Sequence, residues 1–341
     1  MDIPVKKVGL IAEDKPSHVF IGYGGYISGS VFHCIKVKDS VRKALKKMIF
    51  VDLGERVIHY TFEMCHPHWR PICKTYKEGE DHLNPYDNDA LDKWIAERFQ
   101  NIGYGGKEFT EDMKEYGAVY ALNMAYIQPH YLSDKTVEQI YAGADEDTLS
   151  LVQGNGANTA IVHGGVHPIA DDYIPKFTDT IVNLVERMVK VFDMPIKYIN
   201  TYDEPNLGTV TPHQMCRIAK LTRQKLDEKG LQDVLLNGPA TAGINLAYAK
   251  AMKQIDPEAF ELYNKITLHS FSTGMMDIPH RQEVRELGKD LWITSTGAPG
   301  DKRLTQLPRN EKGEVYDDDD VHGVANASAA LVDINLGASY M

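Results

Sequence analysis

Two adjacent carboxyl groups followed by a proline are the residues best suited to chemistry in this sequence. Asp203 and Glu204 come directly after the apolar, β-branched run 196–202, and Pro205 ends that run because it has no backbone N–H for a sheet. Carboxyl groups at the end of a buried strand can transfer protons as general acid and general base. A helix-capping Asp next to a surface Glu is the structural alternative. The residues alone leave both interpretations open.

The elements that would position this pair alternate along the chain between strand and helix. Apolar or β-branched runs typical of strands cover residues 19–24, 56–63, 118–126, 196–202, 234–240, 265–271, 291–296 and 336–341. Apolar residues at helical spacing predict helices over 39–48, 88–100, 169–192, 212–229, 244–254 and 321–334. This alternation predicts an α/β fold with a parallel sheet. Eight such strands favour a (β/α)8 TIM barrel that forms a single domain over residues 1–341.

Composition excludes several classes of partner. The chain has 341 residues, with 48 acidic and 37 basic side chains, and a formal net charge of −11. Basic residues never form a run longer than two, so neither nucleic acid nor an anionic membrane surface is an expected partner. Apolar runs are too short to cross a bilayer. We therefore expect a soluble protein, cytoplasmic or secreted after removal of a signal peptide, and the sequence leaves its oligomeric state open.

Other motifs point to no cofactor and no metal. The glycines of 22–25 follow a strand, but Ile27 stands where a dinucleotide-binding fingerprint needs its third glycine. The segment 65–73 contains two cysteines and two histidines whose spacing fits no standard zinc site. Four consecutive aspartates at 317–320 are typical of a solvated loop.

The carboxylate motif resembles that of a known group of enzymes. Residues 203–206, Asp-Glu-Pro-Asn, resemble the Asn-Glu-Pro acid/base motif of the clan A glycoside hydrolases. Residues 153–159, 169–192 and 20–25 are similar to segments of glycoside hydrolase family 30, in the same order along the chain. The resemblance implies a β-glycosidase with a carbohydrate ligand and Glu204 as the acid/base. Such retaining enzymes use two carboxyl groups about 5–5.5 Å apart on either side of the scissile bond.

The second carboxyl group is missing from this motif pattern. The family places its nucleophile in a Trp-x-Thr-Glu-x-Gly context on strand 7, and the matching stretch 292–297 has Ser295 at the glutamate position. A serine hydroxyl without an adjacent base is a poor nucleophile at an anomeric carbon. The resemblance therefore implies a retaining scaffold whose hydrolysis is impaired.

Further residues are expected to bind the substrate at the same rim. Asp203 stands where the family has Asn, and it can accept a hydrogen bond from a sugar hydroxyl. His59 and Phe271 match family positions occupied by Arg and Tyr. Aromatic rings can stack on sugar faces or pack in the core. The expected substrate-binding set is Asp203, His59, His269, Phe271, Trp292, Trp69 and Tyr126.

Three functions from different classes remain open. The first is a glycoside hydrolase with Glu204 as acid/base and Ser295 at the vacated nucleophile position. The second is a repurposed or designed barrel in which Glu204 or Asp203 abstracts a proton as general base, with His59 or His269 as partner. The third is a carbohydrate-binding protein without catalytic activity. The resemblance selects neither the sugar nor the linkage.

Overall fold

The sheet at the centre of the fold is parallel and has its strands in sequence order. The computed structural model describes residues 24–26, 37–63, 84–97, 104, 106–125, 161–162, 165–166, 169–207, 210–243, 246–270, 278–296, 331, 334 and 338–340. The strands of the sheet are β1 (Gly25–Tyr26), β2 (Val57–Glu63), β3 (Val119–Ala125), β6 (Ile196–Asn200), β7 (Leu235–Thr241), β8 (Tyr263–Ser270), β9 (Leu291–Thr296) and β10 (Ala338–Tyr340). Every strand in it runs parallel to its neighbours.

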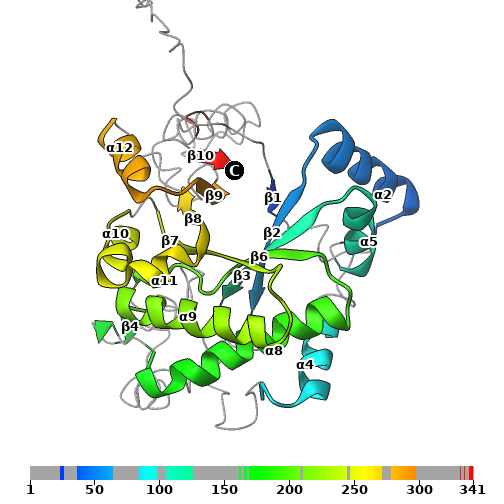
Figure 1. The fold of residues 1–341 in the computed structure, drawn as a ribbon. Helices are drawn as coiled ribbons and strands as arrows, with labels where there is room; N and C mark the ends of the chain where they lie inside the picture. Colours follow the sequence, from blue (N-terminus) through cyan, green and yellow to red (C-terminus); the bar gives the residue numbers. More distant parts are fainter. Residues whose placement is uncertain are drawn as a thin grey trace, which may run out of the picture.

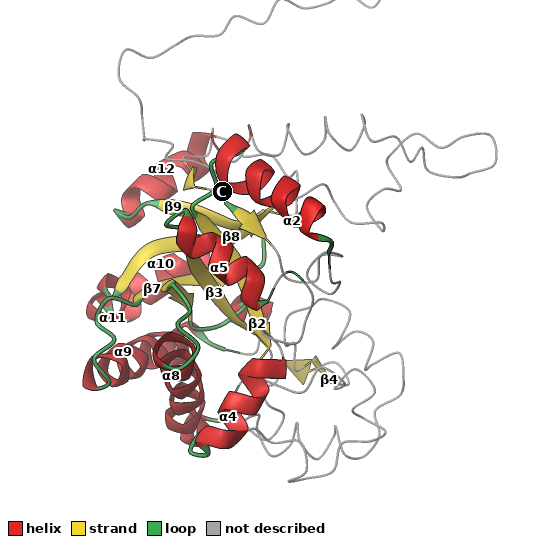
Figure 2. Cartoon of the chain, turned by 90° about the vertical axis from the view of Figure 1, so that its right-hand side faces the viewer, coloured by secondary structure: helices red, strands yellow, loops and turns green. Residues whose placement is uncertain are grey.

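Helices flank the sheet, as two views a quarter turn apart show (Figure 1, Figure 2). They are α2 (Asp39–Lys46), α4 (Asn88–Ile95), α5 (Lys107–Glu115), α8 (Ile174–Lys190), α9 (Pro212–Glu228), α10 (Leu246–Ile255), α11 (Pro257–Glu261) and α12 (Ile278–Leu287). A π-helical segment, Lys47–Asp52, continues α2, and short 3-10 helices cover Asp171–Tyr173 and Pro205–Leu207. The two-residue strands β4 (Ile161–Val162) and β5 (Gly165–Val166) form a separate antiparallel pair.

The predicted α/β class and parallel sheet are confirmed, whereas closure of the barrel is not established. Among the described residues, the strands form a curled parallel sheet, and no strand ladder joins β1 to β10. One side chain does span this gap. The hydroxyl of Tyr340 accepts a hydrogen bond from the Val57 N–H at 3.1 Å. Its ring lies so close to Gly24 that a Cβ there would be 2.8 Å from Tyr340 Cε1.

Most predicted elements are found, with revised bounds. β2, β3 and β6 to β10 each overlap a predicted run, but β1 begins at Gly25, after the run 19–24. The helix expected over 169–192 begins at Ile174, where Pro175 occupies a first-turn position that needs no backbone N–H. The helix expected over 321–334 lies mostly outside the described residues. Sequence reasoning missed α5, α11 and α12, which are short or largely polar.

Packing on the outer face fixes the strand that precedes the carboxylates. The apolar stripe of α8 is buried, and Phe177 on this helix meets the ring of Tyr202 edge-on, with centroids 6.0 Å apart. α9 begins with a capping box, in which Thr211 and Gln214 exchange side-chain and backbone hydrogen bonds. The side-chain amide of Gln214 also donates to the Ile169 carbonyl at 2.7 Å, which ties the start of α9 to the segment before α8.

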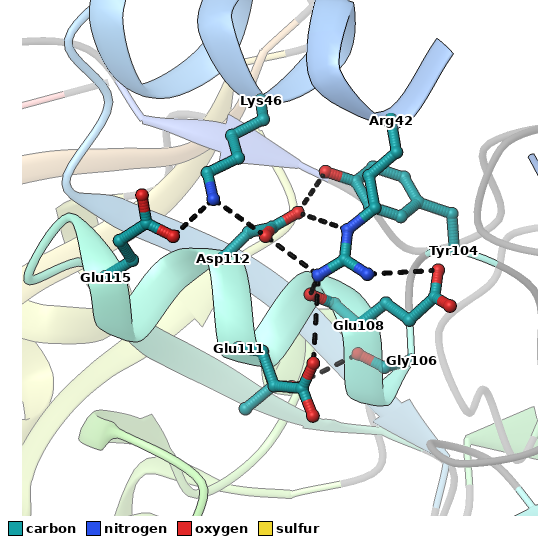
Figure 3. A network of polar contacts seen from close by, with 9 residues as sticks. Arg42, Lys46, Tyr104, Gly106, Glu108, Glu111, Asp112 and Glu115 are labelled. Atoms are coloured by element: carbon teal, nitrogen blue, oxygen red, sulfur yellow. Dashed lines mark hydrogen bonds and ion pairs between the residues drawn. The ribbon is translucent and has the colours of Figure 1, made fainter. Parts of the chain in front are cut away.

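A buried carboxylate joins α2 to α5 (Figure 3). Arg42 donates to both oxygens of Asp112, at 3.0 and 2.9 Å, and the Tyr104 hydroxyl donates to one of them at 2.9 Å. Lys46 lies 3.2 Å from the same carboxylate. Burial opposes ionisation of Asp112, but the hydrogen bonds from these three residues outweigh it and hold the pKa of this carboxyl below its usual range. The network therefore requires Asp112 in its charged form.

Replacing this carboxylate should destabilise the protein. We expect Asp112→Asn to lower the free energy of unfolding by about 3 kcal/mol at pH 7, because it leaves Arg42 next to a neutral group in a buried site. Since the folded-state pKa of Asp112 is lowered, this contribution is present above the ordinary pKa of about 4 and is lost as the pH falls below it. Urea denaturation at pH 7 and pH 3 measures both. Glu111→Gln is the control, because the Glu111 side chain is 54% exposed. Equal losses in the two variants would contradict the role given to Asp112.

Candidate functional site

The two carboxylates lie in a turn that the end of β7 holds in place. Glu204 has a positive φ of 50°, and its N–H donates to the carbonyl of Ala240 at 2.9 Å. Asn206 forms a reciprocal pair with Ala242, donating to its carbonyl at 3.0 Å and accepting from its N–H at 2.7 Å. A left-handed conformation costs a residue other than glycine about 1 kcal/mol or more. The contacts with β7 offset this cost and fix where Asp203 and Glu204 lie.

One imidazole contacts both carboxylates. His269 Nδ1 lies 2.7 Å from Glu204 Oε1, and its Nε2 lies 3.6 Å from Asp203 Oδ1. The side-chain amide of Asn123 donates a hydrogen bond to the same Asp203 oxygen. All four residues are buried. The ends of β3, β6 and β8 thus meet in one cluster, which we call the carboxylate cluster: Asn123, Asp203, Glu204 and His269.

Burial and charge raise the pKa values of Asp203 and His269. Burial raises the pKa of Asp203 to about 6, with a further rise from the charge of Glu204, against the lowering effects of His269 and Asn123. Burial disfavours the charged form of His269, but its hydrogen bond to Glu204 and the charges of both carboxylates outweigh this and raise its pKa. Asp203 can therefore exchange a proton near pH 6.

His59 lies on β2, next to this cluster, and is neutral. Burial lowers the pKa of His59 to about 3, with a further lowering from the nearby His269, against a raising effect from the backbone of Thr294. Strand register pairs His59 with Ala121, two residues before Asn123 on β3. His59 therefore lies near the carboxylate cluster, and its neutral imidazole adds no charge to that cluster.

The strand register brings position 295 to the same level of the sheet. Ser295 on β9 pairs with His269 on β8, so its backbone lies beside that of a residue in the carboxylate cluster. The side chain of Ser295 belongs to the part of the chain that the structure does not describe. Phe271, Trp69 and Tyr126 also lie outside the described residues.

Trp292 has a different environment from the one that its motif suggests. It is the second residue of β9, and its ring packs against Tyr198 and Tyr340, with centroids 4.8 and 5.1 Å away. The ammonium group of Lys265 lies 5.9 Å from the same ring. Strand register pairs Trp292 with Thr267, two residues before His269 on β8. We assign Trp292 to packing inside the sheet.

Sequence reasoning missed a row of asparagines under the carboxylates. Asn123, Asn200 and Asn237 are in register on the adjacent strands β3, β6 and β7, and all three are buried. Thr267 donates to Asn200 Oδ1 at 3.0 Å. The Oδ1 atoms of Asn123 and Asn237 have no hydrogen-bond partner among the described residues. Buried acceptors of this kind suit a bound hydroxyl group or an ordered water. An asparagine inside an otherwise apolar strand was the available signal.

Metal sites and membrane-spanning helices are two further features for which the described residues can be assessed. In the described ranges, no group of three or more His, Cys, Asp or Glu side chains is placed to hold a metal ion. The segments 65–73 and 317–320 lie outside those ranges. Among the helices that are described, none is long and apolar enough to cross a membrane.

Similarity to known proteins is found at the level of the fold. No model of a known protein family matches the sequence, and no curated protein matches it. Xyn30A of Clostridium acetobutylicum, a glycoside hydrolase family 30 subfamily 8 xylanase, superposes with a TM-score of 0.50 at 13% identity, over 88% of this chain and 69% of its own. SrfJ of Salmonella typhimurium superposes with a TM-score of 0.61 at 9% identity, over 96% and 68%. A glucosidase of Croceicoccus marinus superposes with a TM-score of 0.52 at 11% identity, over 95% and 59%. This chain therefore has the curled α/β fold of these proteins, two of which are glycoside hydrolases.

The burial of Asp203 predicts an unusual pH dependence of stability. Because its folded-state pKa is about 6 against an ordinary value of 3.8, folding favours the protonated acid. This contribution is fully present below about pH 4 and is lost as the pH rises through 6. When the pH is raised from 4 to 8, the free energy of unfolding of Asp203→Asn should therefore increase by about 3 kcal/mol relative to that of the parent. Thermal unfolding at the two pH values measures this, with the exposed Asp233→Asn as control. An equal difference at both values would contradict the assignment.

Proposed function

We propose that this chain binds β-linked glycosides or oligosaccharides at the carboxyl ends of the strands of a (β/α)8 barrel. Glu204 is the acid/base of the site, and position 295 is the nucleophile position, vacated by replacement of a glutamate with Ser295. The observation that carries the proposal is the carboxylate cluster, because it gathers two carboxyl groups, an imidazole and an amide at that end of the sheet. The shared fold with a xylanase and a glucosidase supports the same substrate class.

The chemistry of the cluster suits a ligand rich in hydroxyl groups. Carboxylates and amide oxygens accept hydrogen bonds from hydroxyls, and Asn123 Oδ1 has no partner among the described residues. Glu204 is held by its backbone and its carboxylate, so it can transfer a proton to or from a glycosidic oxygen at a defined position. Asp203, fixed by Asn123, accepts a hydrogen bond from a neighbouring hydroxyl.

The serine at position 295 determines the expected level of activity. Double displacement needs a carboxylate on the face of the sugar opposite the acid/base, both to attack and to stabilise the positive charge of the transition state. A serine hydroxyl supplies neither at neutral pH. We therefore expect slow or undetectable hydrolysis by the parent protein, together with retained sugar binding.

Restoring the carboxylate should restore hydrolysis. We expect Ser295→Glu to cleave one member of a panel of 4-nitrophenyl β-glycosides at least about 10³-fold faster than the parent, the scale of loss when a nucleophile is removed. Azide or formate should accelerate the parent by occupying the same place. Release of 4-nitrophenol measures both effects.

Matched variants separate this outcome from a general change of the pocket. Ser295→Ala should remain as slow as the parent, and adding Glu204→Gln to Ser295→Glu should remove the restored activity. Oligosaccharide binding without turnover by any of these proteins would instead identify a carbohydrate-binding protein. Neither binding nor turnover on the whole panel would overturn the proposal.

A second candidate function is proton abstraction from an activated carbon. The observation that favours it is the raised pKa of Asp203, about 6, because a base with a pKa near the working pH transfers protons efficiently. Under this alternative, ring opening of 5-nitrobenzisoxazole by the parent should increase as the pH rises through 6. Asp203→Asn should remove that increase, and the exposed Asp233→Asn should keep it. A rate that follows hydroxide alone in all three proteins would rule this function out.

A further inference from the structure

His269 differs from the other expected substrate-binding residues because both of its ring nitrogens face carboxylates of the protein, one within hydrogen-bond distance and the other at 3.6 Å. We infer that His269 is a positioning residue, which holds the carboxylate of Glu204 in one orientation at the end of β6. The inference rests on the proposed role of Glu204 in proton transfer. It replaces the expectation that His269 contacts the ligand.

The geometry favours positioning over ligand binding. Nδ1 lies 2.7 Å from Glu204 Oε1, and Nε2 lies 3.6 Å from Asp203 Oδ1, so each nitrogen faces a different carboxylate. The His269 side chain is only 5% exposed, against 11% for Glu204. The imidazole is therefore more deeply buried than the two carboxylates, and little of its polar edge is left for a ligand.

The backbone on either side of this contact is also fixed. Glu204 donates its N–H to Ala240 on β7, and His269 lies inside the ladder between β7 and β9. A glutamate side chain loses considerable rotamer freedom when it is held, so a free one would sample several orientations. Anchoring both the backbone and one carboxylate oxygen leaves the other oxygen in a defined place for proton transfer.

The protonation state of the His269 imidazole determines whether it can interact favourably with both carboxylates. A neutral imidazole has one N–H and donates to one acceptor, whereas an imidazolium donates from both nitrogens. Among the described residues, the groups that act electrostatically on His269 include the carboxylates of Asp203 and Glu204 and the imidazole of His59. His59 is neutral, so two negative charges face His269 and support its charged form. Loss of its proton would release one of the two carboxylates.

The protonation of His269 can be measured without any assay of activity. Long-range ¹H–¹⁵N spectra of the full chain should show His269 protonated at both nitrogens at pH 7. Glu204→Gln should reduce its proton affinity at least about 10-fold, a shift of one pH unit. His213, an exposed histidine on α9, is the internal control and should titrate identically in both proteins. Identical titration of His269 in the parent and in Glu204→Gln would overturn the inference.

A kinetic measurement separates positioning from a purely structural role. In the Ser295→Glu background, His269→Ala should lower kcat on the cleaved aryl glycoside about 10²-fold with KM nearly unchanged, as when a transition-state interaction is lost. His269→Gln, which keeps one donor, should recover part of the loss. A raised KM with unchanged kcat in folded protein would assign His269 to substrate binding and overturn the inference. If the Ser295→Glu protein cleaves no glycoside, the proposed function fails, while the spectra still test the contact between His269 and Glu204.

Discussion

Removal of two adjacent carboxyl groups from water is the constraint around which this site is arranged. An ionised carboxylate in a protein interior loses several kcal/mol of hydration unless charges and hydrogen bonds replace it. Here the replacement comes from the imidazole of His269 and the amide of Asn123, which lie on β8 and β3, on opposite sides of β6. Neither partner is near Asp203 or Glu204 in sequence. The site therefore exists only when the carboxyl ends of three strands lie at the same level.

The parallel register of the strands places their carboxyl ends at the same level. Contacts with β7 hold the turn that contains Asp203 and Glu204. Gly238 on β7 lies against the ring of Tyr263, and a Cβ at this position would come within 2.6 Å of Tyr263 Cε1. The close approach of β7 to β8 therefore requires glycine. Two residues later, the Ala240 carbonyl accepts the hydrogen bond from the Glu204 N–H, and the Ala240 N–H donates to the Thr267 hydroxyl at 3.1 Å. A backbone contact and a buried side chain thus link the packing of β7 and β8 to the position of Glu204.

Local sequence pattern was enough to predict most of the scaffold, the carboxylates and His269 as a candidate partner, but not Asn123. Apolar runs marked the strands because a sheet covered by helices buries both faces, and Pro205 marked the end of one. α5 was not predicted because it has only nine residues. Its buried apolar residues, Phe109 and Met113, are too few to give a clear helical periodicity. Asn123 was not predicted as a site residue because its contact with Asp203 depends on the register between strands that are distant in sequence. Trp292 was placed in the site by its motif, and its ring contacts with Tyr198 and Tyr340 likewise depend on register between distant strands.

The central claim is that position 295 lies where a glycosidase of this fold carries its nucleophile. Intact-mass and peptide-mass spectrometry of the Ser295→Glu variant, after incubation with activated 2-deoxy-2-fluoro β-glycosides, tests it most directly. Such reagents trap the glycosyl-enzyme intermediate of a retaining enzyme, because the fluorine slows its hydrolysis. The account predicts a mass increase of one fluoroglycosyl group, mapped to the introduced carboxylate at position 295 and absent from the parent. No adduct with any sugar of the series, or an adduct at another residue, would contradict it.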